Sequence, residues 1–147
     1  MRKLRLGLSS REAEIVETVY LDSAVLDEVL FAASRTALEI VGALAGYAIR
    51  DAVYISSWKH LEGHVSEDEF RIETCALVGY AEALTTQRML GIIHSHPSGQ
   101  AVISLWDSHF AARSPYLWLI VARNQRLFRS YVHRGNGVVI ELRSCTF

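Results

Sequence analysis

The sequence contains little cysteine and proline and no long hydrophobic run. Two cysteines in 147 residues exclude a disulfide framework and a cysteine-based zinc finger. The longest apolar stretch, residues 40–49, is about half of the ~20 residues that a membrane-spanning helix needs. Fifteen Lys and Arg residues against 16 Asp and Glu residues give a net charge of −1, which argues against a basic nucleic-acid-binding surface. We therefore expect a cytoplasmic protein that binds neither nucleic acid nor membrane.

The remaining composition and patterning favour one α/β domain. Half of the residues are hydrophobic and 21% are charged, which is enough apolar material for a core. Residues 1–14 form a polar N-terminal segment, expected to be loosely held or to support a homodimer, and residues 15–147 form the domain. A single mixed β-sheet flanked by about three helices is expected, because strands follow one another directly near the C-terminus. Strands are predicted at 15–20, 42–47, 52–58, 89–93, 116–122, 126–133 and 138–143, helices at about 22–37, 73–87 and 104–112, and a polar loop at 59–69.

Two histidines follow the apolar strand at residues 89–93. His94 and His96 are two positions apart, and an extended chain has a period of two, so both imidazoles should leave the strand on the same side. Pro97 disfavours helix at His96 and should end the strand there. Two converging neutral imidazoles are a ready pair of zinc ligands.

A serine and an aspartate follow at helical spacing. Ser104 and Asp107 are three residues apart, which places both on one face of the predicted helix. Asp107 can supply a third zinc ligand, and a site with two histidines and one carboxylate leaves a fourth position for water, as catalytic zinc sites do. Ser104 can donate a hydrogen bond to a developing oxyanion. Both residues also fit a simple helix N-cap, and the two roles are compatible.

Glu39 is the best candidate for a general base. It is a charged residue within an otherwise apolar stretch, residues 37–42, where a carboxylate needs a partner or a purpose. A zinc ion lowers the pKa of a bound water toward ~7, and a carboxylate must then accept the proton and return it to the leaving amine. The alternative for Glu39 is an exposed carboxylate at the end of the first helix.

These residues together resemble the signature of the JAMM/MPN (Mov34/JAB1) metalloproteases. That signature is a glutamate followed later by His-x-His, seven residues, a serine, two residues and an aspartate, and it is matched here by Glu39, His94, His96, Ser104 and Asp107. The order of expected elements agrees from about residue 15 to residue 143.

The segment after the glutamate is also similar to the family's pattern. Gly42 and Gly46 stand at the expected positions after Glu39. Two departures are mild: Ile103 stands where many prokaryotic members have proline, and Val41 where cysteine is frequent.

The resemblance implies a cytidine-deaminase-like core and a zinc-dependent isopeptidase with one Zn²⁺ per chain. His94, His96 and Asp107 would bind the zinc, Glu39 would serve as general base and acid for zinc-bound water, and Ser104 would stabilise the oxyanion. The short chain is similar to stand-alone prokaryotic members. Those act on the C-terminal tail of ubiquitin-like modifiers or sulfur-carrier proteins.

Two other functions remain open on the sequence. One is a non-catalytic scaffold of the same fold, although such members usually lack a ligand and this chain has all of them. The other is a RadC-like protein linked to DNA repair, which the stretch at residues 96–99 resembles. Two further groups have no assigned role: His60 and His64, expected in a solvated loop, and a C-terminal arginine cluster, interpreted as a solvated face or a docking surface for an acidic partner. The cluster comprises Arg123, Arg126, Arg129 and Arg134.

Overall fold

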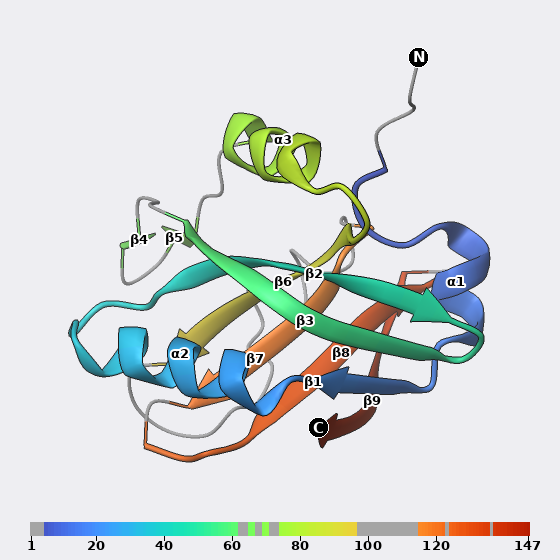
Figure 1. Cartoon of the computed structure of the whole chain (residues 1–147). Helices are drawn as coiled ribbons and strands as arrows, with labels where there is room; N and C mark the ends of the chain where they lie inside the picture. The colour runs from blue at the N-terminus through green and yellow to red at the C-terminus, as the bar shows by residue number, and fades with distance from the viewer. Residues whose placement is uncertain are drawn as a thin grey trace.

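The computed structural model describes residues 5–61, 65–66, 69–70, 74–96, 115–122, 124–135 and 137–147. Its central feature is a seven-stranded barrel with the strand order β1-β3-β2-β6-β7-β8-β9, accompanied by a separate two-stranded sheet, β4-β5 (Figure 1). The strands are β1 Thr18–Leu21, β2 Val41–Ile49, β3 Ala52–Leu61, β4 Val65–Ser66, β5 Glu69–Phe70, β6 Arg88–His96, β7 Leu117–Ala122, β8 Phe128–Arg134 and β9 Val138–Thr146. The helices in the described residues are α1 Ser10–Ile15, α2 Ser23–Ser34 and α3 Thr74–Ala83.

The sheet is mixed, as expected, but it closes on itself. The short strand β1 pairs in parallel with both β3 and β9 and so completes the barrel. The register of β2 shifts between Ala45 and Gly46 against β3, and between Leu44 and Ala45 against β6. Such bulges bend a strand and increase its twist, which favours closure. Sequence periodicity does not show which strands pair when they lie far apart in the chain, so closure of the barrel was not predicted.

Two apolar clusters lie on the two sides of the barrel wall. The inner one fills the barrel, and α2 contributes Leu26 and Val29 to it. The outer one covers β2, β6 and β7 and includes Leu77 and Ala81 of α3. All six residues of β7 are buried, which explains its uninterrupted apolar sequence: a strand buried on both faces shows no alternation.

The first long helix ends earlier than predicted. α2 begins at the N-cap Asp22, whose carboxylate accepts from the N–H of Ala24 at 2.8 Å, and ends at Ser34 rather than at about residue 37. The Ser34 hydroxyl donates to the carbonyl of Phe31, and the Thr36 hydroxyl accepts from the N–H of Leu38. These side-chain bonds compete with helical ones and favour a turn. Glu39 therefore lies on the connection to β2 and not at a helix end.

Other boundaries also differ. α3 ends at Ala83, four residues short of the prediction. The expected loop at 59–69 begins inside β3, contains β4 and ends at the first residue of β5. The helix predicted at 104–112 lies outside the described residues. Among those that are described, no helix is long and apolar enough to cross a membrane.

The N-terminal segment from residue 5 onward packs on the barrel instead of being loosely held. Leu8 is buried, and α1 starts with a capping box between Ser9 and Glu12. Glu12 pairs with Arg88 at 2.7 Å, and Arg134 donates to backbone carbonyls at residues 13 and 16. A single buried leucine among polar residues gives a weak sequence signal, although it anchors the segment.

Candidate metal centre

The end of β6 holds the two predicted histidines side by side. Their ring centroids are 4.9 Å apart, which agrees with the expectation that alternate residues leave the strand on one side. They project from the outer wall of the barrel, the side to which Ile92 also contributes. The His94 side chain is 2% exposed, while His96 is partly exposed. The pair thus has one deeply embedded and one solvent-accessible imidazole.

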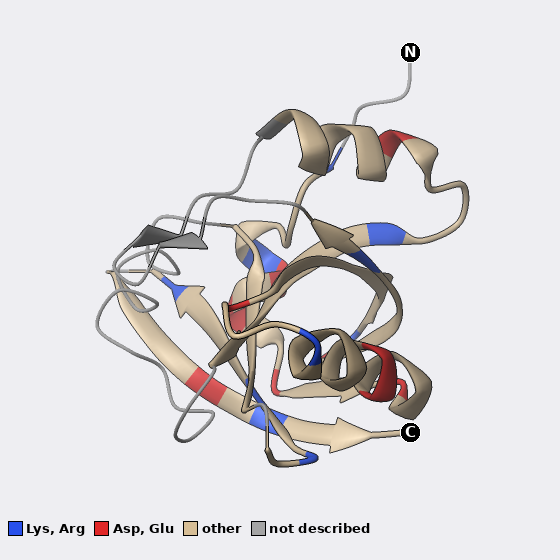
Figure 2. Ribbon diagram, turned by 90° about the vertical axis from the view of Figure 1, so that its left-hand side faces the viewer, with Lys and Arg blue, Asp and Glu red and all other residues tan. Residues whose placement is uncertain are grey.

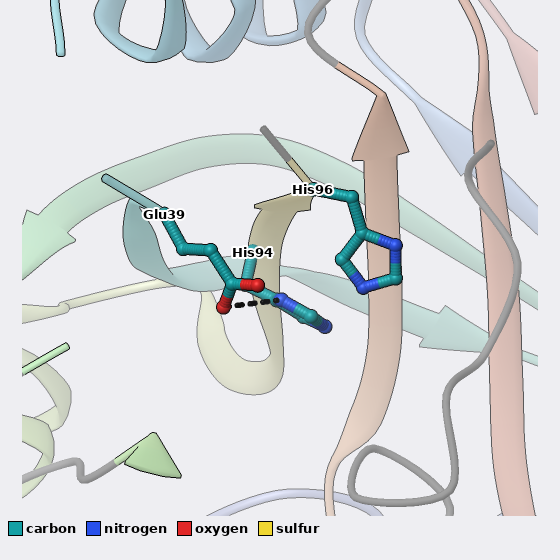
Figure 3. Close-up of side chains that lie close together, drawn as sticks. All are labelled: Glu39, His94 and His96. Carbon is teal, nitrogen blue, oxygen red and sulfur yellow. Dashed lines mark ion pairs between the residues drawn. The ribbon is translucent and has the colours of Figure 1, made fainter. Parts of the chain in front are cut away.

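Glu39 reaches this pair from the connection between α2 and β2 (Figure 3). Its Oε2 lies 3.7 Å from Nδ1 of His94, and its side chain is 30% exposed. One candidate ligand atom from each of Glu39, His94 and His96 falls within 4.8 Å of the others. Imidazole nitrogens are ligands that zinc accepts, and a carboxylate beside them can exchange a proton with a water on the metal, so the residues present fit a zinc ion.

The structure therefore brings together three of the five predicted site residues. Ser104 and Asp107 lie outside the described residues, and their predicted roles as oxyanion stabiliser and third zinc ligand stay predictions.

Trp118 forms the wall behind His94. It comes from β7, is 1% exposed, and its ring centroid lies 5.0 Å from that of the histidine. Contact with a large, immobile indole restricts the rotation of the imidazole, which favours one orientation of the ligand nitrogens.

Two glycines after Glu39 have a steric explanation. A Cβ on Gly42 would lie 2.5 Å from the Trp58 ring and 3.2 Å from Ile93. A Cβ on Gly46 would lie 1.8 Å from the carbonyl oxygen of Tyr54, beside the bulge at Ser56 of β3. Glycine at these two positions allows β2 to pack closely against Trp58, Ile93 and Tyr54. β2 in turn fixes the backbone that leads to Glu39.

Ser95, which separates the two histidines, has no role predicted from the sequence. It is completely buried and bonds to Ile40, the neighbour of Glu39. The bonded residues are 55 positions apart in sequence, so no local pattern could reveal this contact.

Of the other candidate residues, those that the structure describes are not members of the Glu39-His94-His96 group. His60 is an exposed residue of β3, stacked on Trp58 with a centroid distance of 5.7 Å, and His64 lies outside the described residues. Of the arginine cluster, Arg126 pairs with Asp27 and Arg129 with Glu141.

Arg134 of the same cluster binds backbone carbonyls, and Arg123 lies outside the described residues. Acidic and basic positions are interspersed along the ribbon (Figure 2). The three described arginines of the cluster are thus each bonded within the chain.

This chain is thus a mixed-barrel domain with a Glu-His-His group at the end of one strand. Comparison with known proteins agrees with this class. A family profile described as prokaryotic homologs of the JAB domain matches residues 22–133, a range that includes Glu39, His94 and His96. The chain belongs to this family. No protein with a curated description matches the sequence.

Several solved structures share the fold. Protein DSY2949 from Desulfitobacterium hafniense is 22% identical, with 88% of this chain and 92% of that chain covered and a TM-score of 0.75. AF2198, a JAB1/MPN domain protein from Archaeoglobus fulgidus, is 19% identical, with 86% and 98% covered and a TM-score of 0.56. A protein from Salinibacter ruber is 16% identical, with 87% and 91% covered and a TM-score of 0.65. At these identities the likeness establishes the fold alone.

Proposed function

We propose that this protein is a zinc-dependent peptidase that hydrolyses the bond after the C-terminal tail of a ubiquitin-like or sulfur-carrier protein. The observation that carries the proposal is the convergence of Glu39, His94 and His96 within 4.8 Å in a chain of the JAB family. A partly exposed carboxylate beside two histidines is the arrangement that a metal-assisted hydrolysis requires.

Each residue has a distinct role in this proposal. His94 and His96 hold the zinc, and Asp107 completes the ligand set. Zinc, when bound, supplies a Lewis acid that polarises a carbonyl and acidifies water. Ser104 donates a hydrogen bond to the carbonyl oxygen as its negative charge develops.

Glu39 accepts the proton from the attacking water and returns it to the leaving amine. Its position supports this role in two ways. Its carboxylate lies beside the ligand histidines, at 3.7 Å from Nδ1 of His94, so a proton need travel only a short way. Its side chain is also partly exposed, which allows exchange of protons with solvent between turnovers.

An open strand edge supports an extended peptide tail as substrate. β1 pairs only with residues Ala52–Ile55 of β3, and in the described part of the chain no strand covers that edge from residue 56 to Leu61. Leu61 of β3 and His94 of β6 both pair with Val41 of β2. The free edge of β3 therefore ends level with the histidines across the sheet. A tail added to this edge would be held by backbone hydrogen bonds, which suit a Gly-Gly sequence without side chains.

The test is hydrolysis of a ubiquitin-like protein with a fluorogenic amine on its C-terminal Gly-Gly tail. We expect zinc-loaded protein to release the amine, and Glu39→Gln to lose ~100-fold or more in kcat while still binding zinc, because general base catalysis contributes about 10²–10⁴-fold. His94→Ala should lose both zinc and hydrolysis. Glu141→Gln, a surface carboxylate on β9, is the matched control and should be fully active. Zinc binding without hydrolysis of any Gly-Gly-tailed protein would contradict the proposal and favour a scaffold.

A further inference from the structure

Ser95 lies between the two histidines but on the opposite face of β6. His94 and His96 project from the outer wall of the barrel, while Ser95 points inward, on the side of Ile93, and is completely buried. A buried hydroxyl is unfavourable unless it has a partner. The partner of this one belongs to the segment that carries Glu39.

Two hydrogen bonds join Ser95 to Ile40. The N–H of Ser95 donates to the carbonyl of Ile40 at 3.1 Å, and the N–H of Ile40 donates to Oγ of Ser95 at 2.9 Å. A regular antiparallel ladder would direct the second bond to the main-chain carbonyl of Ser95. The paired register of β2 and β6 ends one residue earlier, at Val41 and His94. The hydroxyl therefore takes the place of a backbone acceptor at the point where the chain leaves the sheet.

We propose that Ser95 is a positioning residue that aims Glu39 at the histidine pair. Its hydroxyl fixes the peptide group joining Glu39 and Ile40, and so sets the direction in which the Glu39 side chain leaves the backbone. One strand thus performs two tasks through its alternation: the outward side chains bind the metal, and the inward one places the carboxylate. This inference rests on the proposed role of Glu39 as the base.

The catalytic test compares three substitutions of the same buried position. Ser95→Ala removes the acceptor, Ser95→Cys keeps the volume but offers only a weak acceptor, and Ser95→Thr keeps the hydroxyl. We expect kcat to fall roughly 10- to 100-fold in the first two variants, since a small misplacement of a reacting group has effects of this order. KM and the zinc content should not change, and Ser95→Thr should recover most of kcat.

A second buried serine supplies the matched control. Ser130 is also completely buried and bonds to the hydroxyl of Ser144 at 2.7 Å, on strands away from the centre. Ser130→Ala should lower the thermal midpoint by an amount similar to Ser95→Ala and leave kcat unchanged. Equal losses of kcat in the two variants would show a purely structural effect and overturn the proposal.

A double substitution tests whether Ser95 acts through Glu39. In a Glu39→Gln background the carboxylate is already gone, so adding Ser95→Ala should lower kcat by less than about 2-fold, because coupled residues give non-additive effects. A further loss as large as that in the wild-type background would overturn the proposal.

A readout that needs no substrate separates this inference from the proposed function. Hydrogen exchange of the Ile40 amide in zinc-free protein should be slow in the wild type and in Ser95→Thr, and at least about 10-fold faster in Ser95→Ala, since the amide loses its acceptor. Unchanged exchange would overturn the inference whatever the enzyme assay gives. If the wild type hydrolyses no Gly-Gly-tailed protein, the proposed function is wrong. Faster exchange in Ser95→Ala would still establish the backbone contact that directs Glu39.

Discussion

Replacing Glu12 with Gln should destabilise the protein near neutral pH and have no effect in strong acid. The two carboxylate oxygens of Glu12 on α1 accept from Nη1 and Nη2 of Arg88 at 2.7 and 2.9 Å. Arg88 is the first residue of β6, so the pair joins the N-terminal segment to the strand that carries the histidines. The hydrogen bonds from the Arg88 guanidinium lower the pKa of Glu12 from its ordinary value of 4.5 to about 2.

The magnitude and the pH range follow from that pKa. A fall from 4.5 to about 2 corresponds to an upper limit of ~3.4 kcal/mol, at 1.36 kcal/mol for each unit. The side chains of Arg88 and Glu12 are 26% and 24% exposed, and solvent screening of such a pair reduces the expected contribution to ~1–2 kcal/mol. Because the folded-state pKa is the lower one, this contribution is complete above the unfolded pKa of 4.5 and disappears as the pH falls through about 2.

Denaturant unfolding of zinc-free protein at several pH values measures this difference. Glu12→Gln should lose ~1–2 kcal/mol near pH 7 and much less near pH 2–3. The amide oxygen can still accept from the N–H of Ser9, so the substitution keeps the capping contact and removes the charge together with one of the two acceptors for Arg88. Glu141→Gln breaks the more exposed pair with Arg129, at 3.3 Å, and should change the stability by less than ~0.5 kcal/mol. A loss for Glu12→Gln that is equally large at both ends of the pH range would show that the charge of Glu12 is not what stabilises the protein.

Three further outcomes are expected. Gly42→Ala should lower the free energy of unfolding by ~1–3 kcal/mol, because its Cβ would meet the Trp58 ring at 2.5 Å. Gly79→Ala on α3, where a Cβ would have nothing within 4 Å, should raise the free energy of unfolding by ~0.5–1 kcal/mol. Denaturant unfolding measures both variants, and equal effects would show that the contact with Trp58 is not the cause. Trp118→Leu should weaken zinc binding roughly 10-fold in competition titrations by freeing the His94 ring, and unchanged affinity would exclude that support. Zinc at ~100 times its Kd should stabilise the wild type by ~2.7 kcal/mol and should not stabilise His94→Ala, so an equal gain in both would place the metal elsewhere.

The sequence predicted the elements that local pattern controls. The strand before the histidines was recognised from its apolar run and the following proline, and the two imidazoles lie on one side because a strand alternates. Glu39 was identified from its motif, and the structure brings its carboxylate next to His94.

Features that depend on distant contacts could not be predicted. Closure of the barrel requires β1 to meet both β3 and β9, and the segment around Leu8 and Glu12 is held by residues far along the chain. α2 ends early because side-chain hydroxyls near residue 34 compete with the helix, a balance that periodicity does not show. The bond from Ile40 to Ser95 spans 55 positions and appears only after the strands have paired.

The most direct test of the central claim is the zinc content per chain, measured by elemental mass spectrometry on wild-type protein and on His94→Ala and Glu39→Gln variants loaded in parallel. We expect close to one zinc per chain in the wild type and in Glu39→Gln, since Glu39 is assigned to proton transfer, and almost none in His94→Ala. A folded wild-type protein that takes up no zinc, or a His94→Ala variant that keeps it, would contradict a metal centre at the end of β6.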